Sequence, residues 1–320
     1  MKKIFFSLII ILFFSCNNQE EVIKRTSFVM GSTIEVQIKT KDLQKANLVI
    51  DSVFNEAKRI DTLFSTYISN NSMWKINNAI KDTIKVDEEI FFILKKSDEL
   101  WKKTEGAFDP ALGNLIQLIG FDKKNPKIPP QLEVKKVLNN IGWKKIKLIE
   151  PNILIKPKNV KLNFNAIVPG YAADICSKII IRNGFNNFLV NVGGEIFCKG
   201  DNWKIGIQHP RSKNEILMKI NVNNYGISTS GDYEQFIIKG KKRFNHIFNP
   251  KTGLPANECE SVTIIAKDAL TSDVFSTAVF VLGPSKGINL INKEKDIEGI
   301  IVDTTGNIIK SIGFKNFELR

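Results

Sequence analysis

The spacing of apolar residues alternates along this 320-residue chain between the period of strands and the period of helices. Residues 22–30 and 32–40 alternate apolar and polar side chains about Gly31, which predicts a hairpin. Apolar side chains then recur at helical spacing over residues 43–63, which predicts a long helix. Strand patterns dominate after residue 145. Because no repeat, low-complexity linker or domain break interrupts these patterns, we predict a single α+β unit.

The other predicted elements follow from the same periods and from turn and cap signals. Residues 64–77 are expected to form a polar loop. Further helices are predicted at 87–103, 109–121, 132–141, 171–182 and 272–282, the second of them with Asp109 as N-cap and Pro110 as its first residue. Further strands are predicted at 146–149, 153–156, 160–166, 188–192, 195–199, 203–208, 216–222, 234–239, 244–248, 261–266, 299–303 and 308–313.

The amino terminus is typical of an exported lipoprotein. Lys2 and Lys3 precede an apolar run over residues 4–14, which is too short to span a bilayer and suits a signal peptide. The run ends in Phe-Phe-Ser-Cys, which resembles a bacterial lipobox. We therefore expect cleavage before Cys16, removing signal peptide 1–15, lipid on Cys16, a tether over 16–21 and a folded domain over 22–320. The alternative is plain secretion.

This terminus predicts a location in the cell envelope, as a membrane-anchored lipoprotein that faces the periplasm from the inner or the outer membrane. Asn17, rather than Asp, follows the lipidated position and favours the outer membrane. The other cysteines are Cys176, Cys198 and Cys259. Their odd number and the absence of CxxC spacing argue against a disulfide framework or a thiolate zinc site.

The charge of the chain does not indicate a nucleic-acid partner. The formal net charge is +13, and it falls to +11 when Lys2 and Lys3 leave with the signal peptide. The lysines are scattered in pairs with no aromatic and basic stripe, so we interpret them as a solvated surface that could attract an anionic ligand. With 43% hydrophobic residues, the domain can form one large core or two moderate ones.

One of only two histidines in the chain lies in RFNHIFNPKTG, residues 243–253. A strand over 244–248 would place Phe244, His246 and Phe248 on one face, directly before the Asn249-Pro250 turn. Imidazole is suited to proton transfer near neutral pH, so His246 is a candidate general base. A packing role for His246 remains the alternative at this point.

A candidate metal site lies in TSDVFSTAVFVLG, residues 271–283. Thr271 or Ser272 is the expected N-cap, and Asp273 falls in the first turn. Asp273 and Thr277 are four residues apart and so share one helix face, where their oxygens could hold Mg²⁺. The alternative is an acid that only interacts with the helix dipole. Two other sites also have two interpretations. Asp109 could cap a helix or lie in a loop that binds an anion. Gly193-Gly194 could form only a tight turn, or it could let a ligand approach the backbone closely.

Eight motifs occur in the order and spacing of one enzyme family, and they cover roughly residues 22–318. They are MGST (30–33), STY with later Ser and Asn (65–77), GAFDPALGNLIQLIGF (106–121), FNAIVPGYAAD (164–174), NVGGEI (191–196), STSGDYEQF (228–236), HIFNPKTGLP (246–255) and SDVFSTA (272–278). This series resembles the FAD:protein FMN transferases, the ApbE family. The resemblance implies a T-fold-like α+β unit of mixed or antiparallel sheets with flanking helices.

The resemblance also implies an activity. Mg²⁺ holds the pyrophosphate of FAD, a Ser or Thr hydroxyl of an acceptor protein attacks the FMN phosphorus, and AMP leaves. His246 matches the base of the family. The metal positions are Asp273, Ser276, Thr277 and the carbonyl of Ala166. The FAD-contact positions are Met30, Tyr67, Ala107, Phe108, Asp109, Asn163, Pro169 and Ile247. The implied acceptor is a membrane-associated electron-transfer protein with an FMN-binding domain.

Three residues depart from the family pattern. Pro169 replaces a common Lys, Gln or Glu, Asn163 replaces a frequent Asp, and Asn249 replaces the Asp of many members. They put FAD contacts in doubt but leave His246 and the metal positions intact. Two alternatives to FMN transfer stay open on the sequence, namely an FAD pyrophosphatase that releases FMN and AMP, and a flavin-binding lipoprotein without catalysis. Oxygen ligands also leave Mg²⁺ and Mn²⁺ equally possible.

Overall fold

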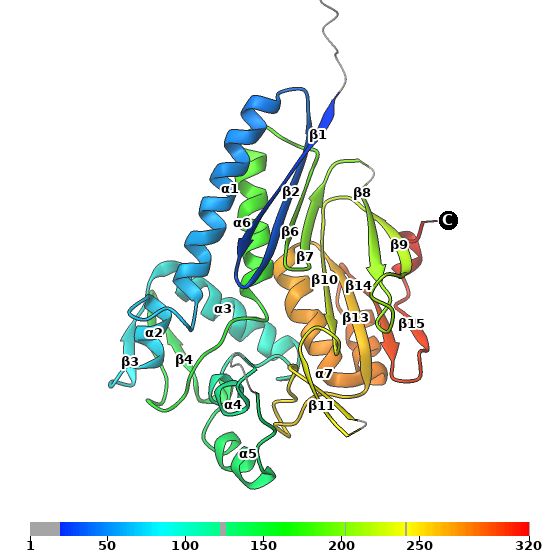
Figure 1. Ribbon diagram of the computed structural model, residues 1–320. Coiled ribbons are helices and arrows are strands. Elements are labelled where there is room, and N and C mark those ends of the chain that lie inside the picture. Colours follow the sequence, from blue (N-terminus) through cyan, green and yellow to red (C-terminus); the bar gives the residue numbers. More distant parts are fainter. Residues whose placement is uncertain (1–19, 122–125, 202, 241, 320) are drawn as a thin grey trace, which may run out of the picture.

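The computed structural model describes residues 20–121, 126–201, 203–240 and 242–319 (Figure 1). The predicted signal peptide 1–15, Cys16 and residues 17–19 of the predicted tether lie outside these residues. Glu21, which was assigned to the tether, begins the first strand. From there on, the described chain consists of helices and antiparallel strands, and the α+β prediction is confirmed.

An eight-stranded sheet forms the centre of the fold, in the order β1-β2-β6-β7-β10-β13-β14-β15 with every neighbour antiparallel. Its strands are β1 Glu21–Val29, β2 Ser32–Thr40, β6 Phe188–Val192, β7 Glu195–Lys199, β10 Tyr225–Gly231, β13 Cys259–Ala266, β14 Ile297–Asp303 and β15 Ile308–Lys310. All eight residues of β13 are buried, because both faces of the sheet are covered at its centre.

Three helices cover one face of the sheet, and they bury the larger apolar cluster. Helix α1 (Leu43–Phe64) packs on β1 and β2, α6 (Val168–Arg182) on β6 and β7, and α7 (Ala269–Lys293) on β10, β13 and β14. In α1 the buried residues recur at the predicted helical spacing. Helix α7 is long and apolar enough to cross a membrane, but most of its apolar residues are buried, and it packs on this sheet and on α6.

The opposite face carries the smaller apolar cluster, under the hairpin of β8 (Trp203–Gln208) and β9 (Ile216–Val222). Successive side chains of one strand point to opposite faces of the sheet and so enter different clusters. In β6, Leu189 belongs to the smaller cluster and Val190 to the larger one. The composition allowed one core or two, and the structure has two apolar clusters separated by one sheet.

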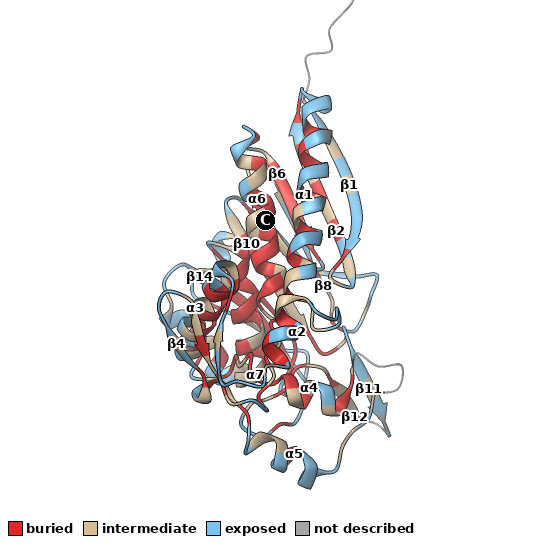
Figure 2. Ribbon diagram, turned by 90° about the vertical axis from the view of Figure 1, so that its left-hand side faces the viewer, coloured by how far each residue is buried: buried red, intermediate tan, exposed pale blue. Residues whose placement is uncertain are grey.

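Most of the remaining elements lie in the lower half of the molecule in Figure 1. Figure 2 shows buried residues concentrated where helices meet the sheet, whereas α5 is mostly exposed. The helices are α2 Ser72–Asn77, α3 Glu88–Lys103, α4 Gly113–Ile119 and α5 Gln131–Leu138, with short 3-10 turns at Trp143–Lys145 and Phe314–Asn316. The strands are β3 Thr83–Lys85, β4 Lys147–Ile149 and β5 Ile153–Ile155 in one small sheet, and β11 Phe236–Lys239 with β12 Lys242–Asn245 in a hairpin.

Several predicted elements differ from the observed ones. The predicted loop 64–77 contains α2, whose N-cap Asn71 accepts a hydrogen bond from the Trp74 N–H at 2.7 Å. Strands β3 and β10 were not predicted. Residues 160–166 form no strand, because they turn into α6, which begins at Val168 rather than at 171.

The predicted caps of two helices were wrong. Helix α4 begins at Gly113, so Asp109 is not its N-cap. Helix α7 begins at Ala269, capped by the Asp268 carboxylate, which accepts from the Thr271 N–H at 2.7 Å. Asp273 therefore lies in the second turn, and the helix continues past the predicted end to Lys293 through a kink at Gly283, before Pro284.

We expect Gly226→Ala to lower the free energy of unfolding by about 3 kcal/mol, the upper part of the range for overpacked cores. A Cβ on Gly226 would lie 2.3 Å from the Ala269 nitrogen, where β10 meets the start of α7. Gly206→Ala in β8 is the matched control, because its Cβ would meet only the flexible end of Ile216, at 3.1 Å. Urea denaturation measures both, and equal losses would contradict the prediction.

Candidate active site

Two turns between strands and the last residues of β10 meet at one end of the eight-stranded sheet. The β1–β2 turn has left-handed backbone at Met30 and Gly31, with φ of 54° and 72°. The β6–β7 turn lies beside it, since the Gly193 N–H donates to the Thr33 carbonyl at 3.1 Å. The pairing of Ile227 with Ile196 brings Ser228 of β10 to the level of Glu195, and β10 continues past that level to Gly231. The MGST, NVGGEI and STSGDYEQF motifs are therefore neighbours.

Helix α7 supplies the predicted metal-binding side chains to this end of the sheet. The Asp273 carboxylate is 4% exposed and accepts a hydrogen bond from the Gly170 N–H of α6 at 3.0 Å. Only glycine fits at position 170, because a Cβ there would lie 2.3 Å from the Ala269 carbonyl oxygen. The predicted carbonyl ligand, Ala166, lies in the turn four residues before Gly170.

Two hydroxyl groups of α7 contact the end of β10. The Ser230 Oγ lies 2.9 Å from the Ser276 Oγ and 3.4 Å from the Thr277 Oγ1. Ser276 also donates to the Asp273 carbonyl at 2.8 Å, so its hydroxyl is already engaged twice. Asp273 and Thr277 thus remain the α7 side chains best able to offer oxygens to a cation.

A second carboxylate, that of Glu195 at the start of β7, interacts electrostatically with Asp273. Burial raises the pKa of both carboxyl groups, that of Asp273 to about 7. Among the described residues neither carboxylate forms an ion pair with a lysine or an arginine. Two interacting acids, Asp273 buried and Glu195 half-buried, with no ion-paired basic partner among the described residues, fit a site for a divalent cation.

The donor set matches the preference of Mg²⁺ for hard oxygen ligands. In the described part of the chain, no three His, Cys, Asp or Glu side chains come together as a metal site. A cation at Asp273 would therefore draw on hydroxyl and carbonyl oxygens as well, with water or phosphate completing its shell.

His246 is placed by the carbonyl of Gln235. The predicted strand 244–248 is wrong at this point, since β12 ends at Asn245 and His246 lies in the following bend. The Gln235 carbonyl accepts from the His246 backbone N–H at 3.1 Å and lies 3.3 Å from the ring Nδ1. Because a carbonyl oxygen only accepts, Nδ1 carries the proton and Nε2 keeps its lone pair.

The ring of His246 packs edge-on against Phe121, with centroids 6.4 Å apart. Burial lowers the pKa of His246, so that the imidazole stays neutral at physiological pH. A neutral ring with a free Nε2 is the form that accepts a proton.

The segment 228–235 connects the two halves of the site. Ser228 and Ser230 contact Ser272 and Ser276 of α7, and Gln235 holds His246. The intervening Glu234 interacts electrostatically with Glu195. The structure thus attaches the predicted base and Thr277 of the predicted metal pair to one short segment at the end of β10.

The predicted FAD-contact positions fall into two groups. The first group lies in loops that contact each other. Ala107 and Phe108 are buried, and the Asn163 N–H donates to the Pro110 carbonyl at 2.8 Å, which brings these motifs together. Asp109 accepts from the backbone N–H groups of Ala111 and Trp143 at 2.8–3.1 Å, and burial raises its pKa. Asp109 thus holds two loops in place.

The second group is distributed around the site. Met30 lies in the β1–β2 turn and donates its N–H to Asp61 at 2.9 Å. Pro169 is in the first turn of α6, and Ile247 is buried beside His246. Tyr67, in the loop between α1 and α2, is 61% exposed, so its ring can take part in stacking.

A small cavity of about 140 Å³ adjoins the Ala107 loop and the turn after His246. It lies between Gly106, Ala107, the Asn249-Pro250-Lys251 turn, Glu258 and the α7 residues Val281, Leu282 and Lys286. The cavity shows that the GAFDP and HIFNPKTG motifs, far apart in the sequence, face each other.

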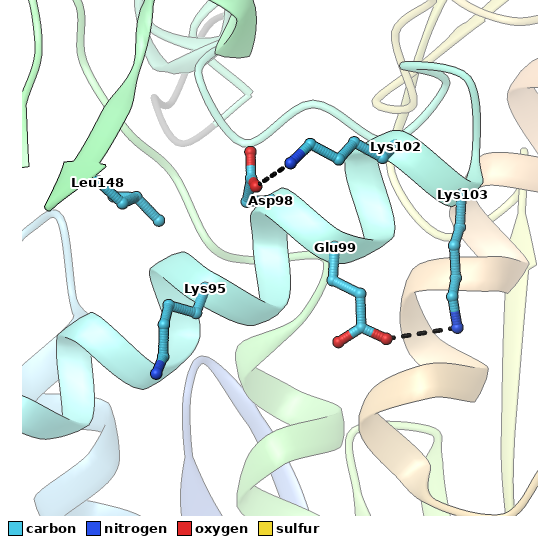
Figure 3. A pocket seen from close by; sticks show the side chains of 6 residues that line it. All are labelled: Lys95, Asp98, Glu99, Lys102, Lys103 and Leu148. Atoms are coloured by element: carbon cyan, nitrogen blue, oxygen red, sulfur yellow. Dashed lines mark hydrogen bonds and ion pairs between the residues drawn. The ribbon is translucent and has the colours of Figure 1, made fainter. Parts of the chain in front are cut away.

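A larger hollow of about 550 Å³ lies on α3 and involves none of the predicted site residues. Its charged side chains are already paired, Asp98 with Lys102 at 2.6 Å and Glu99 with Lys103 at 3.3 Å, as Figure 3 shows. Such paired surface charges leave nothing for a ligand to neutralise.

From the sequence alone, no role was predicted for Glu195, Ser230 or the Gln235 carbonyl. All three lie inside family motifs, NVGGEI and STSGDYEQF. An acid directly after a Gly-Gly turn was the available signal for Glu195. A backbone carbonyl has no signal of its own in a sequence.

Comparisons with known proteins agree with the geometry. A sequence model described as the ApbE family matches residues 30–301. The FAD:protein FMN transferase of Escherichia coli K12 is 29% identical over 279 residues, which cover 83% of this chain and 80% of that protein. The crystal structure of an ApbE protein from Thermotoga maritima superposes with a TM-score of 0.88 at 28% identity, covering 94% of this chain and 100% of that one. The apo flavinyl transferase ApbE of Pseudomonas stutzeri has a TM-score of 0.83 at 26% identity, covering 94% and 98%.

Proposed function

The chain belongs to the ApbE family, and on this basis we propose that it is an FAD:protein FMN transferase that uses His246 as its base. The observation that carries the proposal is the common attachment of His246 and Thr277 to the segment 228–235, with Asp273 four residues before Thr277 on α7. A protein that only captures flavin needs no neutral imidazole beside such a site, which argues against the non-catalytic alternative.

In the proposed reaction, the hydroxyl oxygen of an acceptor Ser or Thr forms a bond to the FMN phosphorus of FAD. The bond between that phosphorus and the bridging oxygen breaks, and AMP leaves with the oxygen. His246 Nε2 takes the proton of the hydroxyl, while Nδ1–H remains hydrogen-bonded to the Gln235 carbonyl. The products are AMP and an acceptor that carries FMN through a phosphoester.

We propose Asp273, Thr277 and the Ala166 carbonyl as ligands for Mg²⁺, with Ser276 holding Asp273 and Ser230 in place. When bound, the cation neutralises charge on the pyrophosphate as the bond breaks. The residues of the chain contribute orientation. Gly170 N–H and Ser276 fix the Asp273 turn of α7, and the motif loops around Met30, Ala107 and Asn163 are proposed to hold the flavin and the nucleotide.

Incubation with FAD, Mg²⁺ and an acceptor with an FMN-binding domain tests the proposal. In-gel flavin fluorescence on the acceptor and an added mass of one FMN unit are the expected results. Release of free FMN and AMP without acceptor labelling would establish the pyrophosphatase alternative. Intact FAD after long incubation with metal and acceptor would support the binding protein.

We also propose that lipid on Cys16 anchors the protein at the periplasmic face of a membrane, where a membrane-associated acceptor is within reach. The basis is the lipobox-like sequence Phe-Phe-Ser-Cys. Cys16→Ser is expected to move the protein from the membrane fraction to the soluble fraction of the envelope. If the variant stayed in the membrane fraction, the anchor would lie elsewhere.

A further inference from the structure

The β11–β12 hairpin, which leads directly to His246, is not part of the eight-stranded sheet. It forms a two-stranded sheet of its own, and strand β12 ends one residue before His246. An isolated hairpin of this length is at best marginally stable in water. The position of His246 therefore depends on the contacts that attach the hairpin to the rest of the molecule.

Arg243 of β12 provides such an attachment to the main sheet. Its guanidinium donates to the Asp232 carboxylate at 2.9 Å and lies over the Phe236 ring of β11, 4.4 Å from the centroid. Asp232 directly follows β10 and is 8% exposed. One guanidinium thus joins both strands of the hairpin to the end of β10.

Asp232 is itself held from the other side. Arg211, from the loop between β8 and β9, binds both oxygens of Asp232 at 2.7 Å and 3.0 Å. Arg211 also reaches Glu260 of β13 at 2.8 Å, and the Asp232 N–H donates to the Glu260 carbonyl at 3.0 Å. Two buried acids and two arginines therefore form a continuous network from the central strands to the hairpin.

We infer that the network of Arg243, Asp232, Arg211 and Glu260 positions His246 for proton transfer, an inference that rests on the proposed function. The network fixes Asp232 three residues before Gln235, whose carbonyl sets the tautomer and orientation of the imidazole. It also fixes Arg243 three residues before His246. Both sides of the Gln235–His246 contact are thereby held, and none of the four network residues needs to touch the substrate.

If the network positions His246, the rate of transfer depends on the planar guanidinium of Arg243, which donates to Asp232 while it lies over the Phe236 ring. Displacing a reacting group by about 1 Å costs on the order of 100-fold in rate. We expect Arg243→Gln to lower kcat for FMN transfer by about 10- to 100-fold, with the KM for FAD changed by less than about twofold. Arg243→Lys keeps the charge but loses the planar group that lies over Phe236, and it should recover part of kcat.

Arg25→Gln is a matched control. Arg25 also pairs with a carboxylate, Asp51 at 2.7 Å, and lies over a phenylalanine, Phe54 at 5.5 Å, with a side-chain exposure of 34% against 32% for Arg243. It connects β1 with α1 and has no link to the hairpin. Its transfer kinetics are expected to match those of the wild type.

A second measurement needs no substrate. The chain has two histidines, so the ¹⁵N signals of the His246 ring can be assigned by comparison with His209→Gln. The wild type should show the Nδ1-protonated tautomer, and Arg243→Gln a mixture of both tautomers. Arg243→Lys, which keeps the charge, provides the same test if the glutamine variant fails to fold.

The outcomes separate this inference from the proposed function. If the wild type transfers no FMN, the function is wrong, and the ring signals still decide whether the network orients His246. If Arg243→Gln keeps the wild-type kcat and tautomer, the inference is overturned. It is also overturned if kcat and FAD affinity fall together by the same factor, because the network would then only stabilise the fold.

Discussion

His246→Ala is expected to lower the rate of FMN transfer by about 100- to 10,000-fold while FAD still binds. The range is that of a lost general base, since His246 is the neutral imidazole at the site and its Nε2 is free to take the proton. Single-turnover transfer to the acceptor measures the rate, and quenching of flavin fluorescence measures binding.

Added imidazole should restore part of the activity of His246→Ala, because the substitution leaves room where the partly buried ring was. The control is the affinity for FAD, which should stay within about threefold of the wild type on this reasoning. A variant that transfers FMN at the wild-type rate would remove His246 from the mechanism.

The pH dependence of transfer has a definite direction. A base works in its deprotonated form, and burial lowers the pKa of His246 below its ordinary value of about 6.5. The transfer rate should therefore be constant from neutral pH upward as far as this group is concerned, and it should fall only on acidification below that ordinary value. At saturating Mg²⁺, which keeps the Asp273 carboxyl deprotonated, a rate that instead rose steeply between pH 7 and pH 8 would identify a different base.

Asp273→Asn is expected to weaken divalent-cation binding by at least about 100-fold. Loss of an outer-shell partner alone costs about 10- to 100-fold, and Asp273 is proposed as a direct ligand. The amide keeps the size of the side chain and an oxygen for the Gly170 N–H, so the helix contact survives. Mn²⁺ titration followed by electron paramagnetic resonance reads the affinity without any turnover.

Ser276→Ala is the comparison for Asp273→Asn. The Ser276 hydroxyl already contacts Ser230 and the Asp273 carbonyl, so we expect a smaller loss of Mn²⁺ affinity. Wild-type affinity in Asp273→Asn would show that the cation binds elsewhere. A larger loss in Ser276→Ala than in Asp273→Asn would make the serine the principal ligand.

The sequence predicted most helices and strands correctly, but it predicted the residues at which they begin and end less well. The β1–β2 hairpin, α1 and α3 were predicted because apolar periodicity records which face is buried. Strand β10 was missed, since its GISTSG residues are small and polar and carry no apolar alternation. Those residues are needed there because α7 packs directly on the strand, and Gly226 contacts Ala269.

The caps of α4 and α7 were misplaced for a related reason. Asp109, Thr271 and Ser272 have the right chemistry for capping, but tertiary contacts recruit them or their neighbours. Asp109 binds the distant Trp143 N–H, and Asp174 of α6 accepts from the first N–H groups of α7 at 2.8 Å and 3.0 Å. The residue types next to a helix end do not show whether an acidic or hydroxyl side chain caps that helix or binds a backbone N–H group elsewhere in the fold.

By itself, the sequence determined the α+β class, the order of the motifs and the family they resemble, and with them the candidate base and metal pair. These depend on residue type and spacing, which are local properties. Only the tertiary structure decided that the Gln235 carbonyl orients His246, that Glu195 lies near Asp273, and that Arg243 and Asp232 hold the hairpin. Backbone groups and long-range ion pairs make these contacts, and their partners are set by how strands and helices pack rather than by neighbours in the chain.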